Sequence, residues 1–524
     1  MIAAWPFSRL LSARRYRPLL LFVCSYGLGI LFWEEPELIL DASRYFTQAK
    51  HLELSGPDFF LKEWGKEIFA WTDMPVLPFI YGTIFRLIDE SRLYIQIFTT
   101  FCFATTTVLT CLIGKKLWDE ETGFTAGMLM LGIPYLFSQV PLMLVDVPLM
   151  FLLILSVYIF ILALERGGLM IPVAALSLCI TFFAKYSAWL MLSEIFVIFF
   201  IYGMKAYGVS RTKSPTRHRV LNGVVVFFMS GVLISLIWSL KSEVFLAQIK
   251  LLRDYQGPGL RRWGESFVST FLFQIHPGVT LAALFSVWAA LKKRDHKYIF
   301  ICWLPLLVIA MQIVRIRYIV PVLPLFSLMA AYGLMQVRQE EIRRFIVSGV
   351  VMSSVIVAVF AYRPFLNAIS SVNLKQAGEF LNTVNGPVVE VFTLYAEDSV
   401  AAPAVTVPLL DLFTRKRLVY CDAYHNAGQR DLDSREIRMS PLRFTWEYKN
   451  PRYYAQSCSS FRQKNAEPVI NGRQVGAVVI ITDRLDEGVP DHQGKITMKY
   501  HKMKVFDQDE NEFTFKTFVK IYYD

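Results

Sequence analysis

The sequence predicts a polytopic α-helical membrane protein with about eleven transmembrane helices, followed by a carboxy-terminal soluble domain of the α/β or α+β class. Of the 524 residues, 54% are hydrophobic and only 19% are charged, whereas soluble chains have about 25% charged residues. Apolar runs follow one another from about residue 18 to 362, and residues 363–524 have an ordinary soluble composition. These observations exclude a purely soluble enzyme and a disordered chain.

Eleven segments have the roughly 20 mostly apolar residues that a spanning helix needs. They lie near 18–34, 93–114, 122–138, 147–165, 169–184, 187–204, 219–241, 274–291, 298–314, 317–336 and 345–362. Basic clusters occupy alternate connections, which is typical of cytoplasmic loops. We therefore expect a multi-pass protein of the cytoplasmic (inner) membrane, with a cytoplasmic amino terminus and a periplasmic or extracellular carboxy-terminal domain.

The segment 74–88 is apolar but short, and Pro75 and Pro78 interrupt its start. Counting it as a span would invert every later loop and break the charge pattern, so we expect an amphipathic helix on the outer membrane surface. The stretch 35–92 is then a long external loop. The predicted division is a transmembrane core, 1–362, that includes this loop, and an external soluble domain, 363–524.

The tail shows one helical pattern, at 374–384, and strand-like runs at 386–395, 475–482 and 512–524. No phosphate-binding glycine loop is present, which argues against an ATP-driven pump. The net charge of +11 comes from the membrane half, so we do not expect nucleic acid as a partner. Cys421 and Cys458 lack metal-ligand spacing, and their pairing would require an oxidising compartment.

Ionisable residues at membrane depth are costly and are therefore candidates for function. Asp41 follows the first span and Asp146 begins the fourth, both on the predicted outer side. Each carboxylate could cap a helix or accept a proton from a hydroxyl. Arg44 and Tyr45 lie one helical turn after Asp41 and could orient it or bind a phosphate.

Cationic residues occur at the same predicted boundary. Lys185 stands between two apolar spans, and Arg315 and Arg317 precede Tyr318 at the start of another. Lysine at such a place can extend its ammonium to the membrane surface, and arginine can anchor a helix at the membrane edge. The alternative is phosphate binding, for which the planar arginine fork is suited.

Acids, a lysine and arginines on the external face supply the chemistry for moving a sugar from a lipid phosphate to a hydroxyl. The competing interpretation is a membrane transporter or lipid flippase, which predicts acids near the bilayer centre and repeated halves. A third is a non-catalytic assembly factor that works through its tail. The acids lie at the boundary and no repeat is visible, so a transferase is favoured.

Five motifs occur in an order that resembles the GT-C superfamily of polyprenyl-phosphate-sugar-dependent glycosyltransferases, particularly lipid A aminoarabinose transferases and protein O-mannosyltransferases. They are DASRY at 41–45, DMPVLPFIYGTIFRLI at 73–88, LVDVPLM at 144–150, FFAKYSAW at 182–189 and RIRYIVPVLPLFSLMAAYGL at 315–334. The resemblance covers roughly residues 18–362 and implies a GT-C-like fold. Two departures are Met74, where aminoarabinose transferases have lysine, and Tyr186-Ser187, where Gly-Pro is common.

The resemblance implies an inverting glycosyltransferase in which Asp41 is the catalytic base and Asp146 helps to position the acceptor or the base. It implies that Lys185, Arg315 and Arg317, with Tyr318 nearby, bind the donor phosphate. The expected partners are a polyprenyl-phosphate-linked sugar, a lipid, glycan or protein acceptor, and membrane lipids. No metal-ligand cluster is visible, so we expect no metal and no cofactor. His276, before Pro277, is expected to be structural.

Overall fold

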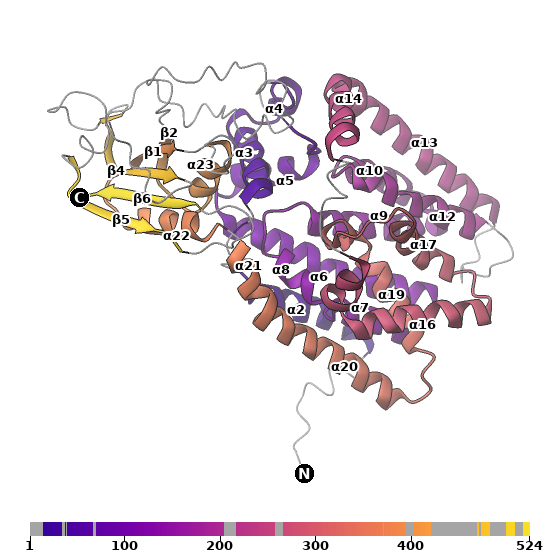
Figure 1. The fold of residues 1–524 in the computed structure, drawn as a ribbon. Coiled ribbons are helices and arrows are strands. Elements are labelled where there is room, and N and C mark those ends of the chain that lie inside the picture. Colours follow the sequence, from indigo (N-terminus) through magenta and orange to yellow (C-terminus); the bar gives the residue numbers. More distant parts are fainter. Residues whose placement is uncertain are drawn as a thin grey trace, which may run out of the picture. The chain divides into compact units, whose positions relative to one another are not determined.

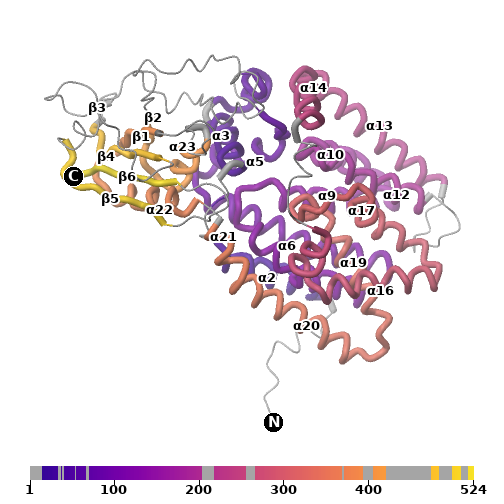
Figure 2. Tube along the Cα trace, viewed as in Figure 1, coloured from indigo at the N-terminus to yellow at the C-terminus, as the bar shows by residue number. Residues whose placement is uncertain are grey.

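The computed structural model describes residues 14–33, 37, 39–66, 70–203, 216–256, 266–369, 371–394, 403–420, 469–470, 473–482, 499–508 and 517–524 (Figures 1 and 2). The internal contacts divide the chain into two compact units. The first unit is Met1–Glu34, Thr72–Leu77 and Gln96–Arg363, and the second is Glu35–Trp71, Pro78–Ile95 and Pro364–Asp524. The sequence predicts that residues 35–92 belong to the membrane core, whereas the contacts group most of them with residues 364–524.

The first unit is helical, and every apolar segment identified in the sequence contains a helix. The helices are α2 (Arg17–Ile30), α6 (Arg92–Leu117), α7 (Glu120–Met130), α8 (Pro134–Gln139), α9 (Asp146–Arg166), α10 (Met170–Phe182), α11 (Ser187–Met191), α12 (Ser193–Gly203), α13 (Thr216–Leu240), α14 (Ser242–Leu251), α16 (Pro277–Lys293), α17 (Tyr298–Ala310), α18 (Ile316–Ile319), α19 (Leu323–Leu334) and α20 (Glu340–Val357). The predicted span 122–138 is divided into α7 and α8, because Pro134 lacks the amide hydrogen that a continuing helix needs and instead begins α8.

Within the described ranges, five helices are long and apolar enough to cross a membrane. They are Arg92–Leu117, Asp146–Arg166, Arg217–Leu240, Ile316–Leu334 and Glu340–Ala368. Several of the other apolar helices are shorter, among them α2, α10 and α17. A helical protein with membrane-spanning helices is therefore confirmed, and the total of eleven spans stays a prediction.

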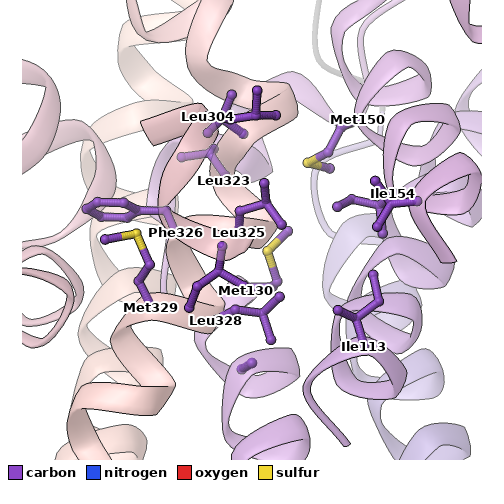
Figure 3. Close-up of a cluster of buried hydrophobic side chains, with 14 of the residues drawn as sticks. Ile113, Met130, Met150, Ile154, Leu304, Leu323, Leu325, Phe326, Leu328 and Met329 are labelled. Carbon is purple, nitrogen blue, oxygen red and sulfur yellow. The ribbon is translucent and has the colours of Figure 1, made fainter. Parts of the chain in front are cut away.

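Helix α19 forms the centre of the first unit. Every residue from Leu323 to Leu334 is buried, and the helix packs against α7, α9, α16 and α17. Figure 3 shows its side chains Leu325 and Leu328 beside Met130 of α7, with Met150 and Ile154 of α9 nearby. This apolar packing fixes the positions of the helices whose ends carry the charged residues identified in the sequence.

The closest approach between α16 and α19 depends on Gly333. A Cβ atom at Gly333 would lie 2.2 Å from the backbone oxygen of Ala282, so Gly333→Ala should force these two helices apart. We expect a loss of about 1–3 kcal/mol in stability, as for other overpacked cores. Thermal unfolding of the detergent-solubilised protein measures this loss. Gly349→Ala, at a position with open space around it, is the matched control.

The second unit contains a sheet with the strand order β2-β1-β4-β6-β5. The strands are β1 (Val388–Leu394), β2 (Arg417–Tyr420), β3 (Val469–Ile470), β4 (Arg473–Thr482), β5 (Lys502–Phe506) and β6 (Phe518–Tyr523). Strand β1 is parallel to β2 and β4, whereas β6 is antiparallel to β4 and β5; β3 pairs with β4 (Figure 2). The runs of Val and Ile in β1 and β4 suit buried strands.

The helix and strands predicted in the tail are confirmed. Helix α22 (Val372–Leu381) overlaps most of the predicted helical pattern, β1 and β6 fall within their strand-like runs, and β4 begins two residues before its run. Helix α22 packs against β5 and β6, and a second helix, α23 (Pro403–Leu412), packs against α22 (Figure 1). Cys421 and Cys458 lie outside the described residues, so their pairing stays a prediction.

Three helices of the predicted external loop complete the second unit: α3 (Ile39–Ser55), α4 (Asp58–Lys62) and α5 (Val76–Leu87), the last of which starts in the first unit. The predicted helix at 74–88 is therefore present as α5. Gly82 of α5 fits closely against α3, because a Cβ there would lie 2.5 Å from the oxygen of Ala49. Leu87 and Ile88 are exposed, as expected of a helix at a membrane surface, a location that stays a prediction.

Candidate functional site

The first unit places a carboxylate between two cations. Asp146 is the first residue of α9 and only 1% of its surface is exposed. Its Oδ1 accepts a hydrogen bond from Nζ of Lys185 at 2.5 Å, and its Oδ2 accepts one from Nε of Arg317 at 2.6 Å. Three residues far apart in the sequence are thereby brought together, and we call Asp146, Lys185, Arg317 and the adjacent Tyr318 the Asp146 cluster.

Lys185 lies in the short connection between α10 and α11. Aromatic contacts close this connection: the rings of Phe182 and Trp189 stack with centroids 4.8 Å apart, and the indole nitrogen of Trp189 donates to the Phe182 oxygen at 3.0 Å. This closed turn presents the Lys185 ammonium to Asp146.

Tyr318 provides an aromatic surface between two cations. The ammonium of Lys185 lies 5.0 Å from the centroid of its ring, and the guanidinium of Arg315 lies 5.7 Å from it. Cations are attracted to the faces of aromatic rings at such distances. Arg317 and Tyr318 are held on the short helix α18, which the buried turn Val320–Val322 connects directly to α19. The ring therefore helps to fix both cations.

This geometry shows what each of these side chains contacts. Asp146 does not precede α9 as a cap would, and both its oxygens contact cations. The Lys185 ammonium contacts Asp146, and the Lys185 side chain is 19% exposed. Arg317 is likewise paired with Asp146, with a side-chain exposure of 11%.

The Asp146 cluster contains two cations and one carboxylate. One carboxylate is bonded to two cations, and Arg315 adds a third through Tyr318. Both cations are partly exposed, whereas Asp146 is not. A cluster of this composition is suited to an anion such as a phosphate group, which accepts charge-assisted hydrogen bonds from lysine and arginine.

Asp41, Arg44 and Tyr45 belong to the second unit. Helix α3 begins at Ile39, so Asp41 lies within the first turn and not at the preceding cap position. Its Oδ1 accepts a hydrogen bond from Nη2 of Arg44 at 2.8 Å, and the Arg44 guanidinium lies 5.8 Å from the ring centroid of Tyr45. The expected grouping of these three side chains is therefore present, and the Asp41 carboxyl is 25% exposed.

A second set of contacts beside Lys185 was not predicted from the sequence. The hydroxyl of Tyr186 donates to Gln248 at 2.7 Å, and the amide of Gln248 donates to the Asp73 backbone oxygen at 2.9 Å. Gln248 is buried. Tyr186 stands where glycine is common in the similar motifs, and its contact gives this departure a structural purpose. Nothing in the sequence around Gln248 signals the contact.

His276 has the structural role expected of it. Its Nδ1 accepts a hydrogen bond from the amide of Gly278 at 3.0 Å and caps α16, while its Nε2 lies 2.9 Å from the Ser353 hydroxyl. Within the described ranges, no group of three or more His, Cys, Asp or Glu residues is placed to hold a metal ion.

Comparisons with known proteins find a matching family model and similar folds. Residues 73–238 match the family model of dolichyl-phosphate-mannose-protein mannosyltransferases. No curated protein sequence matches the chain. Among solved structures, ArnT from Cupriavidus metallidurans bound to undecaprenyl phosphate is similar, with 12% identity and a TM-score of 0.55 over 99% of this chain and 98% of that one.

A second similar structure is the archaeal oligosaccharyltransferase AglB from Archaeoglobus fulgidus, in complex with an inhibitory peptide and a dolichol-phosphate. It has 12% identity and a TM-score of 0.50 over 95% of this chain and 71% of that one. Identities this low describe the fold alone. The family model and the two folds together confirm the resemblance to the GT-C superfamily that the five sequence motifs predict.

Proposed function

We propose that the protein is an inverting glycosyltransferase that moves a sugar from a polyprenyl-phosphate donor to an acceptor on the outer side of the cytoplasmic membrane. The observation that supports it most is the buried Asp146 between Lys185 and Arg317. ArnT and AglB, whose folds are similar, are described with bound undecaprenyl phosphate and dolichol-phosphate, and a phosphate bound by the Asp146 cluster would be the corresponding part of the donor.

The residues divide into three roles. Asp41 is the base that takes the proton of the acceptor hydroxyl or phosphate while the acceptor oxygen attacks the anomeric carbon of the sugar. The bond from that carbon to the phosphate oxygen breaks, and polyprenyl phosphate leaves with the bonding electrons. Lys185, Arg315 and Arg317 stabilise the leaving phosphate.

Asp146 is a positioning residue in this proposal. Both of its oxygens are engaged by cations, so a carboxylate held in this way is a poor proton acceptor. It keeps Lys185 and Arg317 at a fixed separation before the donor binds, which reduces the reorganisation needed during the reaction. Arg44 and Tyr45 orient the Asp41 carboxylate. The acceptor is a lipid, a glycan or a protein.

The direct test is transfer by the purified full-length protein in lipid nanodiscs. A panel of polyprenyl-phosphate sugars is supplied with lipid, glycan and peptide acceptors, and release of polyprenyl phosphate together with the glycosylated product is measured by mass spectrometry. Release coupled to product formation supports the proposal. Movement of the lipid across a vesicle membrane, without cleavage of the sugar-phosphate bond, would instead identify a flippase.

Arg317→Ala should weaken donor binding more than it changes the rate at saturating donor. A charge-assisted hydrogen bond contributes about 1.5–3 kcal/mol, which corresponds to a roughly 10- to 150-fold increase in the Kd of the lipid donor. The Kd is measured by titrating the donor into the nanodisc-embedded protein. Arg253→Ala removes an arginine whose side chain is 77% exposed and should leave the Kd unchanged. Equal affinities of wild type and Arg317→Ala would refute the assigned role.

A further inference from the structure

The segment that contains Asp41 is attached to the carboxy-terminal part of the chain at its start. The backbone oxygen of Glu37 accepts hydrogen bonds from the amide and the hydroxyl of Ser371, at 3.1 and 3.0 Å. The Glu37 side chain is fully buried and accepts a hydrogen bond from Nε of Arg92 at 2.7 Å. The chain entering α3 is therefore fixed four positions before Asp41.

The residue next to Asp41 belongs to the hydrophobic core of the tail. Ala42 is fully buried in a cluster with side chains of α22, α23 and the central strands, among them Leu374, Leu381, Val405 and Leu410. Helix α3 also packs directly against α23. Because Ala42 and Asp41 are neighbours on one helix, the rotation of the helix that buries Ala42 also sets the direction of the Asp41 side chain.

A buried ion pair fixes the part of α3 that follows Asp41 in the sequence. Lys50 is 2% exposed; its ammonium bonds to Glu90 at 2.5 Å and to Asp411 of α23, itself 5% exposed. A lysine is almost never buried unless it is paired. Lys50 lies nine positions after Asp41, about 14 Å along the helix. The three attachments at Glu37, Ala42 and Lys50 thus fix the helix on both sides of Asp41.

We infer that residues 364–524 act as the positioning scaffold for Asp41, with the Lys50–Asp411 ion pair and the Ser371 hydroxyl as positioning groups for the transfer reaction. This inference rests on the proposed function, because it assigns to the tail the placement of the proposed base. The attachments to α3 then affect the chemical step through the placement of Asp41. A displacement of about 1 Å in a reacting group lowers a rate by about 100-fold, so loosening these attachments should act on catalysis.

The experiment uses Asp411→Asn in the full-length protein. This change removes the charge that links Lys50 to α23, while Lys50 keeps Glu90 as a partner. We expect transfer at saturating donor to fall about 10- to 100-fold, with the KM for the lipid donor within twofold of wild type because Lys185 and Arg317 are unchanged. Asp411→Glu retains the charge and should restore most of the rate. Asp58→Asn makes the same substitution in an ion pair on the surface of the same unit and should behave as wild type.

A second measurement tests the attachment itself. Hydrogen–deuterium exchange of the amides in Ile39–Ser55 should be faster in Asp411→Asn than in wild type and unchanged in Asp58→Asn. If Asp411→Asn does not fold, Ser371→Ala takes its place in both measurements. It removes one hydroxyl and keeps the backbone hydrogen bond, so it should show the same changes on a smaller scale.

Distinct outcomes separate the inference from the proposed function. A wild-type rate and wild-type exchange in Asp411→Asn and Ser371→Ala would overturn the inference while wild-type transfer still supports the proposed function. A fall in rate that only equals the loss of folded protein would overturn it as well, since the tail would then contribute stability alone. Absence of transfer by the wild type refutes the proposed function. In that case, unchanged hydrogen–deuterium exchange of α3 in Asp411→Asn would separately refute the attachment of α3 to the tail.

Discussion

Asp41→Asn is expected to fold and to bind the lipid donor normally but to lose transfer by about 100- to 10,000-fold, the usual contribution of a general base. Asparagine has nearly the size of aspartate and its amide oxygen can still accept the hydrogen bond that Arg44 donates to Asp41, so the local structure should persist. What is lost is the ability to take the proton of the acceptor. The rate of product formation at saturating donor and acceptor measures the effect.

Asp89→Asn is the matched control for this prediction, because it makes the same substitution at an exposed position of the same unit. Its rate should equal that of the wild type. Donor titration verifies that Asp41→Asn still binds the lipid. Normal turnover by purified Asp41→Asn would exclude Asp41 as the base and would direct attention to another carboxylate.

Asp146→Leu is expected to have the largest effect on stability. The substitution fills a similar volume but leaves Lys185 and Arg317 without the carboxylate that lies between them. Breaking a buried ion pair by removing one partner costs about 3–5 kcal/mol, since a charge remains in an unfavourable environment. Thermal unfolding of the detergent-solubilised protein should show a clearly lower midpoint than the wild type, and the surviving folded protein should bind the donor poorly.

The double variant Asp146→Leu, Lys185→Met tests this explanation. Removing Lys185 as well takes away one of the two cations that lose their contact with Asp146, so the double variant should be more stable than Asp146→Leu alone. Asp254→Asn, in an exposed pair with Arg253, should have an unfolding midpoint close to that of the wild type. If the double variant is instead less stable than either single variant, the cations are not destabilised by the loss of Asp146.

Much of the helical architecture could be predicted because the signal is local. Each run of apolar residues predicts its own helix, and the runs of Val and Ile in the tail predict β1 and β4. The division of the predicted span 122–138 into α7 and α8 was not predicted, although Pro134 indicates it. The grouping of the loop with the tail could not be predicted, because the attachments at Glu37, Ala42 and Lys50 are made to residues more than 300 positions away.

The Asp146 cluster was predictable in its members but not in its bonding. Charged residues at membrane depth are rare enough that Asp146, Lys185 and Arg317 stand out individually. That one carboxylate binds both cations follows from the packing of α9, α10 and the turn before α19, which no local pattern encodes. Gln248 and Asp411 had no signal at all, because a single polar residue in an ordinary helix has no characteristic spacing.

The discontinuity of the second unit has a consequence for biosynthesis. Its loop helices, α3 to α5, leave the ribosome before Gln96–Arg363, whereas the sheet and α23 are translated after it. At a translation rate of about 5–20 residues per second, roughly tens of seconds pass between the synthesis of α3 and the synthesis of the apolar residues that cover Ala42. In a nascent chain, the face of α3 that bears Ala42 therefore lacks its apolar partners until α22, α23 and the sheet have been translated.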